Sequence, residues 1–235
     1  MSFSTATLRF LRGLASHNTK PWFEAHRDEY ETAVKAPMQA LIEELDVRLA
    51  RFAPEIVGDL KRSMFRIYRD IRFSADKSPY KTHASCWFYH RDGSRGVGRE
   101  AEGGGAGFYF QIAPGESFTG GGMWMPPKEA LAKIREAIAE NPQGFARIAG
   151  DRKLQRRFGG LDDEGQLKRV PRGYAPDHPA ADWLRFQSFV SGRRLSDAQA
   201  TGRRLVTLLE ADFMALLPLV RWINAVLGLR PATRR

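Results

Sequence analysis

Apolar residues recur at helical spacing in the N-terminal part of the chain. This period predicts helices over residues 4–14, 20–35 and 37–52. Pro21 favours the start of the second helix, because proline is well tolerated in a first helical turn. Pro54 should end the third helix, since a proline cannot continue the hydrogen-bond ladder.

The pattern changes near residue 60, where short alternating or aromatic runs replace the helical period. These runs predict strands over residues 63–69, 84–89, 107–112 and 121–125. The dipeptide Pro114-Gly115 predicts the turn between the last two. Strands joined by short turns pair in opposite directions, so this region predicts a mainly antiparallel sheet.

The C-terminal part returns largely to the helical pattern. It predicts helices over 127–140, 142–149 and 151–157, an edge strand at 168–171, a short helix starting at 177–179, a last strand at 186–190 and a helix over 196–215. Pro218 predicts the start of a final helix. Strands flanked by N-terminal and C-terminal helices predict an α+β fold in a single domain spanning residues 1–235. The stretch 91–107 predicts a mobile loop, and residues 231–235 a frayed tail.

The composition is that of a protein with a sizeable core, because 43% of its 235 residues are hydrophobic. The single cysteine, Cys86, excludes an internal disulfide and a cysteine-based zinc cluster, and its aromatic neighbours predict a buried thiol. No apolar run reaches the length of a membrane span, and the N-terminus lacks the apolar core of a signal peptide. We therefore expect a cytoplasmic protein without a membrane partner.

Positive charge is concentrated in one segment. The chain has a formal net charge of +10. Residues 61–99 contain 10 basic and 3 acidic side chains, a net charge of +7. Residues 151–235 contain 16 basic and 9 acidic side chains, so this much longer segment has the same net charge. Such a field attracts phosphates, acidic substrates or nucleic acid. Arginine outnumbers lysine, however, and a GC-rich genome would also produce this excess.

The basic segment predicts a site for a small phosphorylated or carboxylated anion. Arginine suits this role because its planar guanidinium binds such groups in two places. The predicted anion-binding residues are Arg66, Arg69, Arg72, Lys77, Tyr80 and Arg172. Four further side chains are candidates for proton transfer: Asp70, Asp76, His83 and His178. The pattern leaves open whether the protein is an enzyme.

Two alternatives compete with the anion site. In the first, Asp70 and Asp76 pair with the neighbouring cations, and the segment is a structural corner of an adaptor domain. In the second, the basic strands and the aromatic rings of Tyr68 and Tyr80 bind nucleic acid by charge and stacking. The acidic N-terminal quarter and the lack of a known nucleic-acid-binding motif argue against the second.

Metal and cofactor patterns are missing from the sequence. The histidines lack the helical spacing of a metal site, so no metal is expected. Gly120-Gly121-Gly122 lacks the Gly-Lys-Ser/Thr ending of a phosphate loop and is interpreted as a hairpin or bulge. No dinucleotide fingerprint is present, so no cofactor is expected either. Trp22 and Trp124 are candidates for the wall of a pocket.

The string R-x-x-R-D-x-R-F-x-x-D-K-x-P-Y, which runs from Arg66 to Tyr80, resembles the signature of the domain of unknown function family DUF2461. Residues 18–23, 121–126, 171–179 and 218–224 also resemble segments of that family. The resemblance implies one domain and draws attention to the same arginines. It implies no activity, substrate or cofactor, and it does not extend to residues 91–107, which are therefore interpreted as a variable loop.

Overall fold

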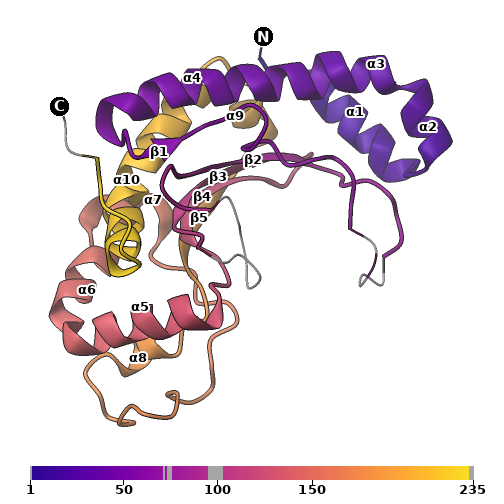
Figure 1. Cartoon of the computed structure of the whole chain (residues 1–235). Helices are drawn as coiled ribbons and strands as arrows, with labels where there is room; N and C mark the ends of the chain where they lie inside the picture. The colour runs from indigo at the N-terminus through magenta and orange to yellow at the C-terminus, as the bar shows by residue number, and fades with distance from the viewer. Residues whose placement is uncertain (1, 71, 73–75, 95–102, 233–235) are drawn as a thin grey trace.

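The centre of the molecule is a five-stranded antiparallel sheet. A computed structural model describes residues 2–70, 72, 76–94 and 103–232. The strands lie side by side in chain order: β1 (Ile56–Val57), β2 (Ala84–His90), β3 (Gly107–Ile112), β4 (Ser117–Met123) and β5 (Phe189–Leu195). Figure 1 shows the sheet as a curved surface between two groups of helices. The mainly antiparallel sheet predicted from the sequence is confirmed.

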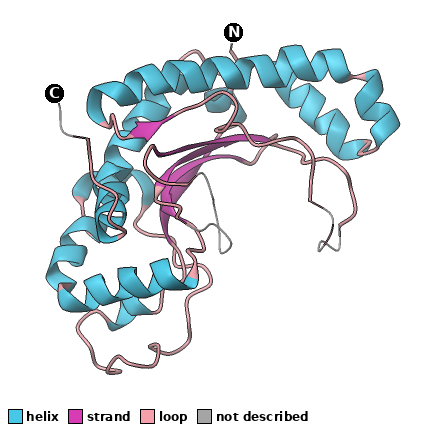
Figure 2. Ribbon diagram, in the orientation of Figure 1, coloured by secondary structure: helices cyan, strands magenta, loops and turns pink. Residues whose placement is uncertain are grey.

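Helices precede and follow the strands. The N-terminal group comprises α1 (Thr5–Ser16), α2 (Lys20–Ala25), α3 (Arg27–Tyr30), the π-helical turn η1 (Glu31–Lys35) and α4 (Ala36–Phe52). After β4 come α5 (Lys128–Glu140), α6 (Pro142–Ala149), α7 (Arg152–Phe158) and α8 (Ala181–Leu184), and after β5 come α9 (Asp197–Ala200) and α10 (Leu205–Val226). Figure 2 shows this α+β arrangement, which confirms the predicted fold class. No helix of the described ranges has the length and apolar content to cross a membrane.

The two faces of the sheet have different surroundings, because side chains alternate along each strand. Phe108 of β3 points to the face covered by α10, where its ring stacks on Phe213 with centroids 4.6 Å apart. Gly121 of β4 lies on the same face, close to Leu216. The opposite face carries Tyr109 and its neighbours on β2, β4 and β5.

A cluster of ion pairs at Asp212 connects α10 to α7 and β5. Asp212 is fully buried, and its carboxylate accepts hydrogen bonds from Arg157 of α7 and Arg193 of β5. Nη2 of Arg193 lies 3.0 Å from Oδ2 of Asp212. A buried carboxylate is tolerated in a protein interior only when such partners compensate for its lost hydration. The cluster therefore fixes α7, β5 and α10 relative to one another.

The predicted helix start at Pro218 is wrong, because α10 runs continuously through this residue. A proline inside a helix loses one hydrogen bond and crowds the carbonyl of residue 214. Pro218 and Met214 both lie on the exposed side of α10, so water can satisfy that carbonyl. The helix predicted over 196–215 is divided instead, since α9 ends at Ala200 and α10 begins at Leu205.

The strand predicted over 63–69 is also wrong. Beside β2 it forms only one isolated bridge, between Met64 and Cys86, supported by hydrogen bonds from Phe65 N to Ser85 O and from Trp87 N to Ser63 O. Beyond this point the chain leaves the sheet, and residues 67–69 pair instead with residues 79–81 through a single bridge between Tyr68 and Tyr80. The edge strand predicted at 168–171 is absent as well, and that segment is a loop.

The remaining boundaries shift by a few residues. β4 starts before the glycine run, so Gly120-Gly121-Gly122 lies in the middle of a strand, and β5 extends to Leu195. Residues 95–102 of the predicted loop at 91–107 lie outside the described residues, as do residues 233–235 of the predicted tail. Ala106, at the end of that loop, is held by Asn224, whose side-chain amide bonds both its N–H and its carbonyl.

Candidate functional site

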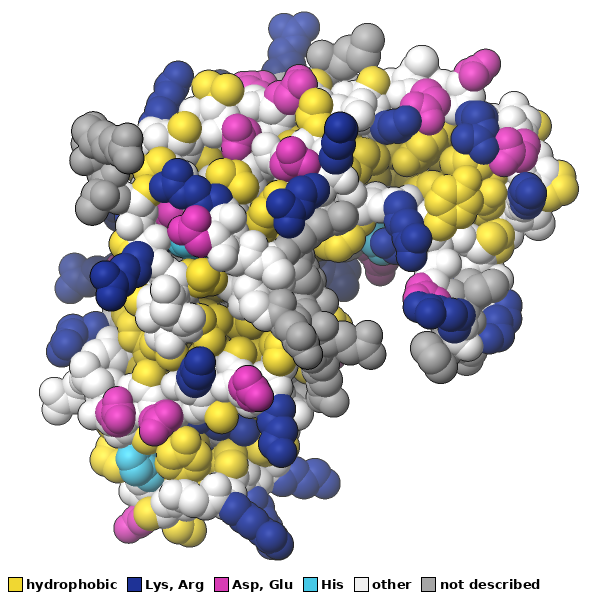
Figure 3. All heavy atoms as spheres, viewed as in Figure 1, with side chains coloured by type: hydrophobic (Ala, Val, Ile, Leu, Met, Phe, Trp, Pro, Cys, Tyr) yellow, Lys and Arg dark blue, Asp and Glu magenta, His cyan; other side chains and the backbone are white. Residues whose placement is uncertain are grey.

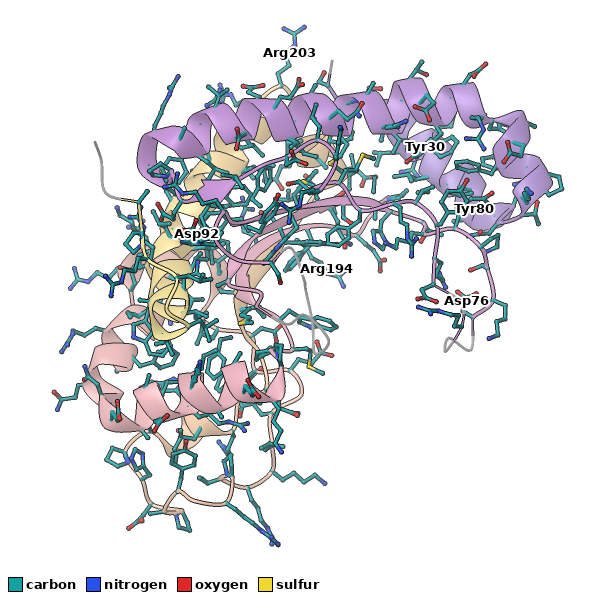
Figure 4. All side chains as sticks on the ribbon, in the orientation of Figure 1. Tyr30, Asp76, Tyr80, Asp92, Arg194 and Arg203 are labelled. Carbon is teal, nitrogen blue, oxygen red and sulfur yellow. The ribbon has the colours of Figure 1, made fainter. Side chains whose placement is uncertain are left out.

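The basic segment predicted to bind an anion forms a projecting arm, defined here as residues 66–81. Its base is a short antiparallel ladder, in which Arg69 N donates to Pro79 O and Lys81 N donates to Ile67 O. Figure 1 shows the arm descending beyond the edge of the sheet, and in Figure 4 Tyr80 lies at its base and Asp76 near its far end. The arm therefore presents its charged residues away from the core.

Several charges of the arm are paired with one another. The Arg69 guanidinium forms an ion pair with Asp76, and Arg72 forms one of 2.7 Å with Asp70. Hydrogen bonding from Arg72 lowers the pKa of Asp70 to about 2. The pKa of Asp76 is lowered by the backbone and side chain of Ser78 and then by Arg69. Both carboxylates are thus ionised at neutral pH, which does not suit a general acid.

The base of the arm is held by the segment that follows α1. The Asn18 side chain accepts a hydrogen bond from Tyr80 N (3.0 Å) and donates one to Tyr80 O (2.9 Å). The Tyr80 ring, only 1% exposed, stacks on Phe23 of α2 at 4.3 Å. Two of the segments singled out in the sequence, 18–23 and 66–80, therefore lie in contact. Figure 3 shows the hydrophobic side chains that gather beside α2.

The other predicted site residues lie apart. Arg66 and Lys77 are exposed on the arm, and His83 is half-buried where the arm meets β2. Burial lowers the pKa of His83, assisted by Lys81 and Arg69. Arg172 and His178 belong to the loop between α7 and α8, at the opposite end of the molecule in Figure 1. His178 Nδ1 accepts a hydrogen bond from Ala180 N there.

A pocket of about 660 Å³ lies elsewhere, on the sheet face opposite α10. We call it the aromatic pocket, because five rings line it: Trp87, Tyr109, Phe118, Trp124 and Phe158. The first three come from β2, β3 and β4, and the last two from the ends of β4 and α7. Trp124 is 58% exposed, an unusual position for so large an apolar ring.

Glycines form the floor of the aromatic pocket between these rings. Gly120, Gly122 and Gly192 lie on its face of β4 and β5. A Cβ on Gly192 would lie 2.2 Å from Cζ of Phe118, so only glycine leaves room for that ring. Gly122 has a φ of 122° and a Cβ there would lie 2.1 Å from Phe189 O. The glycines thus let the Phe118 ring lie close to the backbone of β4 and β5, where it forms part of the pocket wall.

Polar groups are few in the aromatic pocket. The indole Nε1–H of Trp87 is buried, and within the described residues it has no hydrogen-bond acceptor. The Tyr109 hydroxyl donates to Oε1 of Gln111 (2.9 Å), and burial raises the pKa of that phenol. Asp162, on the loop after α7, contributes the one carboxylate among the lining residues. A pocket with apolar walls and one unused donor suits a ligand that carries an acceptor.

Sequence reasoning found part of this pocket. Trp124 lines it as proposed, whereas Trp22 stacks on His26 with ring centroids 4.0 Å apart. The rings of Trp87, Tyr109 and Phe118 looked like ordinary strand residues, because their common face depends on the strand register. The signal that could have found them is the combination of three adjacent glycines with an aromatic residue at alternate positions of the neighbouring strands. No group of three or more metal-ligating side chains occurs in the described part of the chain.

Comparison with known proteins identifies the family. Residues 6–222 match the family described as "Conserved hypothetical protein (DUF2461)", which covers most of the chain. The chain therefore belongs to this family, as its central motif indicated. Neither the curated proteins nor the solved structures include a significant match.

Proposed function

We propose that this member of the family binds a small organic molecule with a flat ring in the aromatic pocket. The observation that carries the proposal is a pocket walled by five aromatic rings, one of which, Trp87, has a buried Nε1–H without a partner among the described residues. A buried donor without an acceptor costs about 1–3 kcal/mol, which a ligand acceptor would recover. The pocket volume of about 660 Å³ lies in the range of small-molecule sites.

The chemistry of the walls favours ring stacking as the source of affinity. Tyr109 and Phe118 are neighbours across β3 and β4, with ring centroids 6.5 Å apart. Gly120 and Gly192 leave room for the Phe118 ring close to the sheet, so this ring is a surface on which a flat ligand can stack. Among the described residues, no lysine or arginine lines the pocket. A neutral ring with one hydrogen-bond acceptor therefore fits better than a strongly charged ligand.

Two fused-ring probes of equal size test this proposal. Quinoline carries a ring nitrogen that accepts a hydrogen bond, and naphthalene does not. We expect quinoline to bind about tenfold more tightly, because one hydrogen bond contributes about 1 kcal/mol. The Trp87→Phe variant should abolish this preference while both probes still bind. Ligand-observed NMR titration measures both affinities.

The matched control is Trp22→Phe, which removes the same indole donor outside the aromatic pocket. Trp22 packs against His26 and Phe10 and should leave the preference for quinoline unchanged. Failure of both probes to bind would overturn the proposal, as would an equal loss of preference in the two variants. Thermal melting of both variants establishes that they are folded.

As a second candidate, we propose that the arm binds a small phosphorylated or carboxylated anion. Arg66 and Lys77 are exposed on it, and Arg69 and Arg72 would exchange the carboxylates of Asp76 and Asp70 for the anion. The internal ion pairs also support the structural alternative, in which the arm serves only as a corner. Isothermal titration with inorganic pyrophosphate distinguishes the two, because only an anion site loses binding in Arg66→Ala without a change in melting temperature.

A further inference from the structure

An open groove of about 470 Å³ runs between α7 and α10, away from the aromatic pocket and the arm. Its α7 side consists of Arg152, Lys153, Arg156 and Arg157. Its α10 side consists of Ala211, Met214 and Ala215. The groove therefore combines a cationic rim with a narrow apolar floor, and neither the family nor the sites described above accounts for it.

The helix α7 is anchored so that its cations remain at the surface. Leu154 is 1% exposed and packs into the core, while Arg152, Lys153 and Arg156 are exposed. Arg156 lies four residues after Arg152 and three after Lys153, and residues at these spacings are neighbours on a helix surface. Arg156 therefore lies beside both of the other charges. Asp151 caps the helix by accepting hydrogen bonds from Lys153 N and Leu154 N.

Arg157 differs from the other three cations of the groove. Its guanidinium is paired with the buried Asp212, whose second oxygen accepts from Arg193. In the described part of the chain, Arg152, Lys153 and Arg156 form no ion pair. The carboxylate of Asp212 is thus already neutralised, and three cations without an ion-pair partner among the described residues face solvent along the rim of the groove.

We propose that this groove binds the phosphate backbone of a single-stranded nucleic acid. Three exposed cations on one helix face can each neutralise a phosphate and release its counterions. The net charge of +10 adds long-range attraction, which acts most strongly on a polyanion. A bilayer surface is a poorer occupant, because membrane binding by a helix needs a broad apolar face and the groove exposes only Met214, at 53%.

The α7–α10 groove is not the surface that the sequence suggested for nucleic-acid binding. That interpretation used the rings of Tyr68 and Tyr80, and Tyr80 is only 1% exposed. The α7–α10 groove contributes charge without aromatic rings. We therefore expect binding that depends strongly on salt and weakly on base sequence.

The test is the salt dependence of binding to a fluorescein-labelled oligothymidylate, followed by fluorescence anisotropy. The probe variant is Arg152→Ala/Lys153→Ala/Arg156→Ala. Each phosphate contact with a single strand contributes about 0.7 to the slope of log K against log salt, so the variant should lose about 2 from that slope. Its affinity at low salt should fall by about tenfold or more.

The matched control is Lys128→Ala/Lys133→Ala/Arg147→Ala, which removes the same charge from α5 and α6. An equal loss of affinity in both triple variants would overturn the proposal, because overall charge would then explain the binding. A slope near zero for the unaltered protein would also overturn it. Binding to phosphatidylserine vesicles in place of the oligonucleotide would assign the groove to membranes instead. Unchanged quinoline binding in the triple variants shows that the aromatic pocket is intact.

Discussion

At the scale of single residues, burial decides which candidate groups can react. Cys86 is fully buried in β2, and burial raises the pKa of its thiol, which confirms the buried thiol expected from its aromatic neighbours. Tyr80 belongs to the predicted motif, but its contacts are those of a packing residue. Its ring stacks on Phe23, and its backbone is hydrogen-bonded by Asn18. The sequence placed Tyr80 in a motif but could not show that its ring is covered.

His83 should make the stability of the protein depend on pH. Burial lowers its pKa from 6.5, with a further contribution from Lys81. The unfolded chain therefore binds more protons than the folded one as the pH falls through this range, and stability decreases. We expect the free energy of unfolding to be lower near pH 5.5 than at pH 7 and this difference to shrink in His83→Gln. Urea denaturation at the two pH values measures it.

A second variant separates the two causes of this shift. Lys81→Met removes the nearby positive charge and leaves His83 buried, so it should reduce the pH dependence only in part. An unchanged pH dependence in His83→Gln would show that another group is responsible. The neutral state of His83 at pH 7 also means that it can accept a proton there but carries no positive charge for an anion.

At the scale of secondary structure, local pattern succeeded where a segment was long and periodic. Helix α5 and strand β3 were predicted to within one residue of their ends, because their patterns match the core that they face. The segment 63–69 has the same alternation but forms only isolated bridges, Met64 with Cys86 and Tyr68 with Tyr80. A strand needs a neighbour for its hydrogen bonds, and the sequence does not say where a sheet ends.

Helix α10 should become more stable when its internal proline is replaced. Proline in a helix interior costs about 3 kcal/mol relative to alanine, and part of this is offset by the more restricted unfolded chain. Because Pro218 is exposed, we expect Pro218→Ala to raise the free energy of unfolding by about 1–2 kcal/mol. Urea denaturation measures the change.

Leu219→Ala serves as the opposite control in the same turn of α10. Leu219 is fully buried, so its truncation should cost about 2–5 kcal/mol. A loss of stability in Pro218→Ala would mean that the proline is needed for the packing of α10. Pro218 and Met214 lie on the exposed side of α10, where water can satisfy the carbonyl of residue 214. A proline, which usually marks the start of a helix, is therefore tolerated in the middle of this one.

At the scale of the whole molecule, the buried Asp212 joins elements that are far apart in the chain. Asp212→Asn would leave Arg157 and Arg193 without their shared carboxylate. We expect this variant to lose about 3–5 kcal/mol of unfolding free energy, because two cations would remain beside a buried site without compensation. Chemical denaturation provides the measurement.

Asp182→Asn is the matched control for the same chemical change. Asp182 is 87% exposed and pairs with Arg185 at 2.8 Å, so its loss should cost less than about 1 kcal/mol. Similar losses of unfolding free energy in the two variants would contradict the proposal that Asp212 holds α10 against α7 and β5. We expect Asp212→Asn to weaken oligonucleotide binding as well. A displaced α7 would no longer hold Arg152, Lys153 and Arg156 along the groove.

The sequence by itself determined the fold class, most helices, three of the strands and the family, because these depend on local periodicity and on a long motif. It also located the basic segment of residues 66–81. Only the tertiary structure decided that this segment is an arm with paired charges, and that Trp87, Tyr109 and Phe118 share one face with a glycine floor. Which side chains meet depends on strand register and helix packing, and both are set by contacts between residues far apart in the chain.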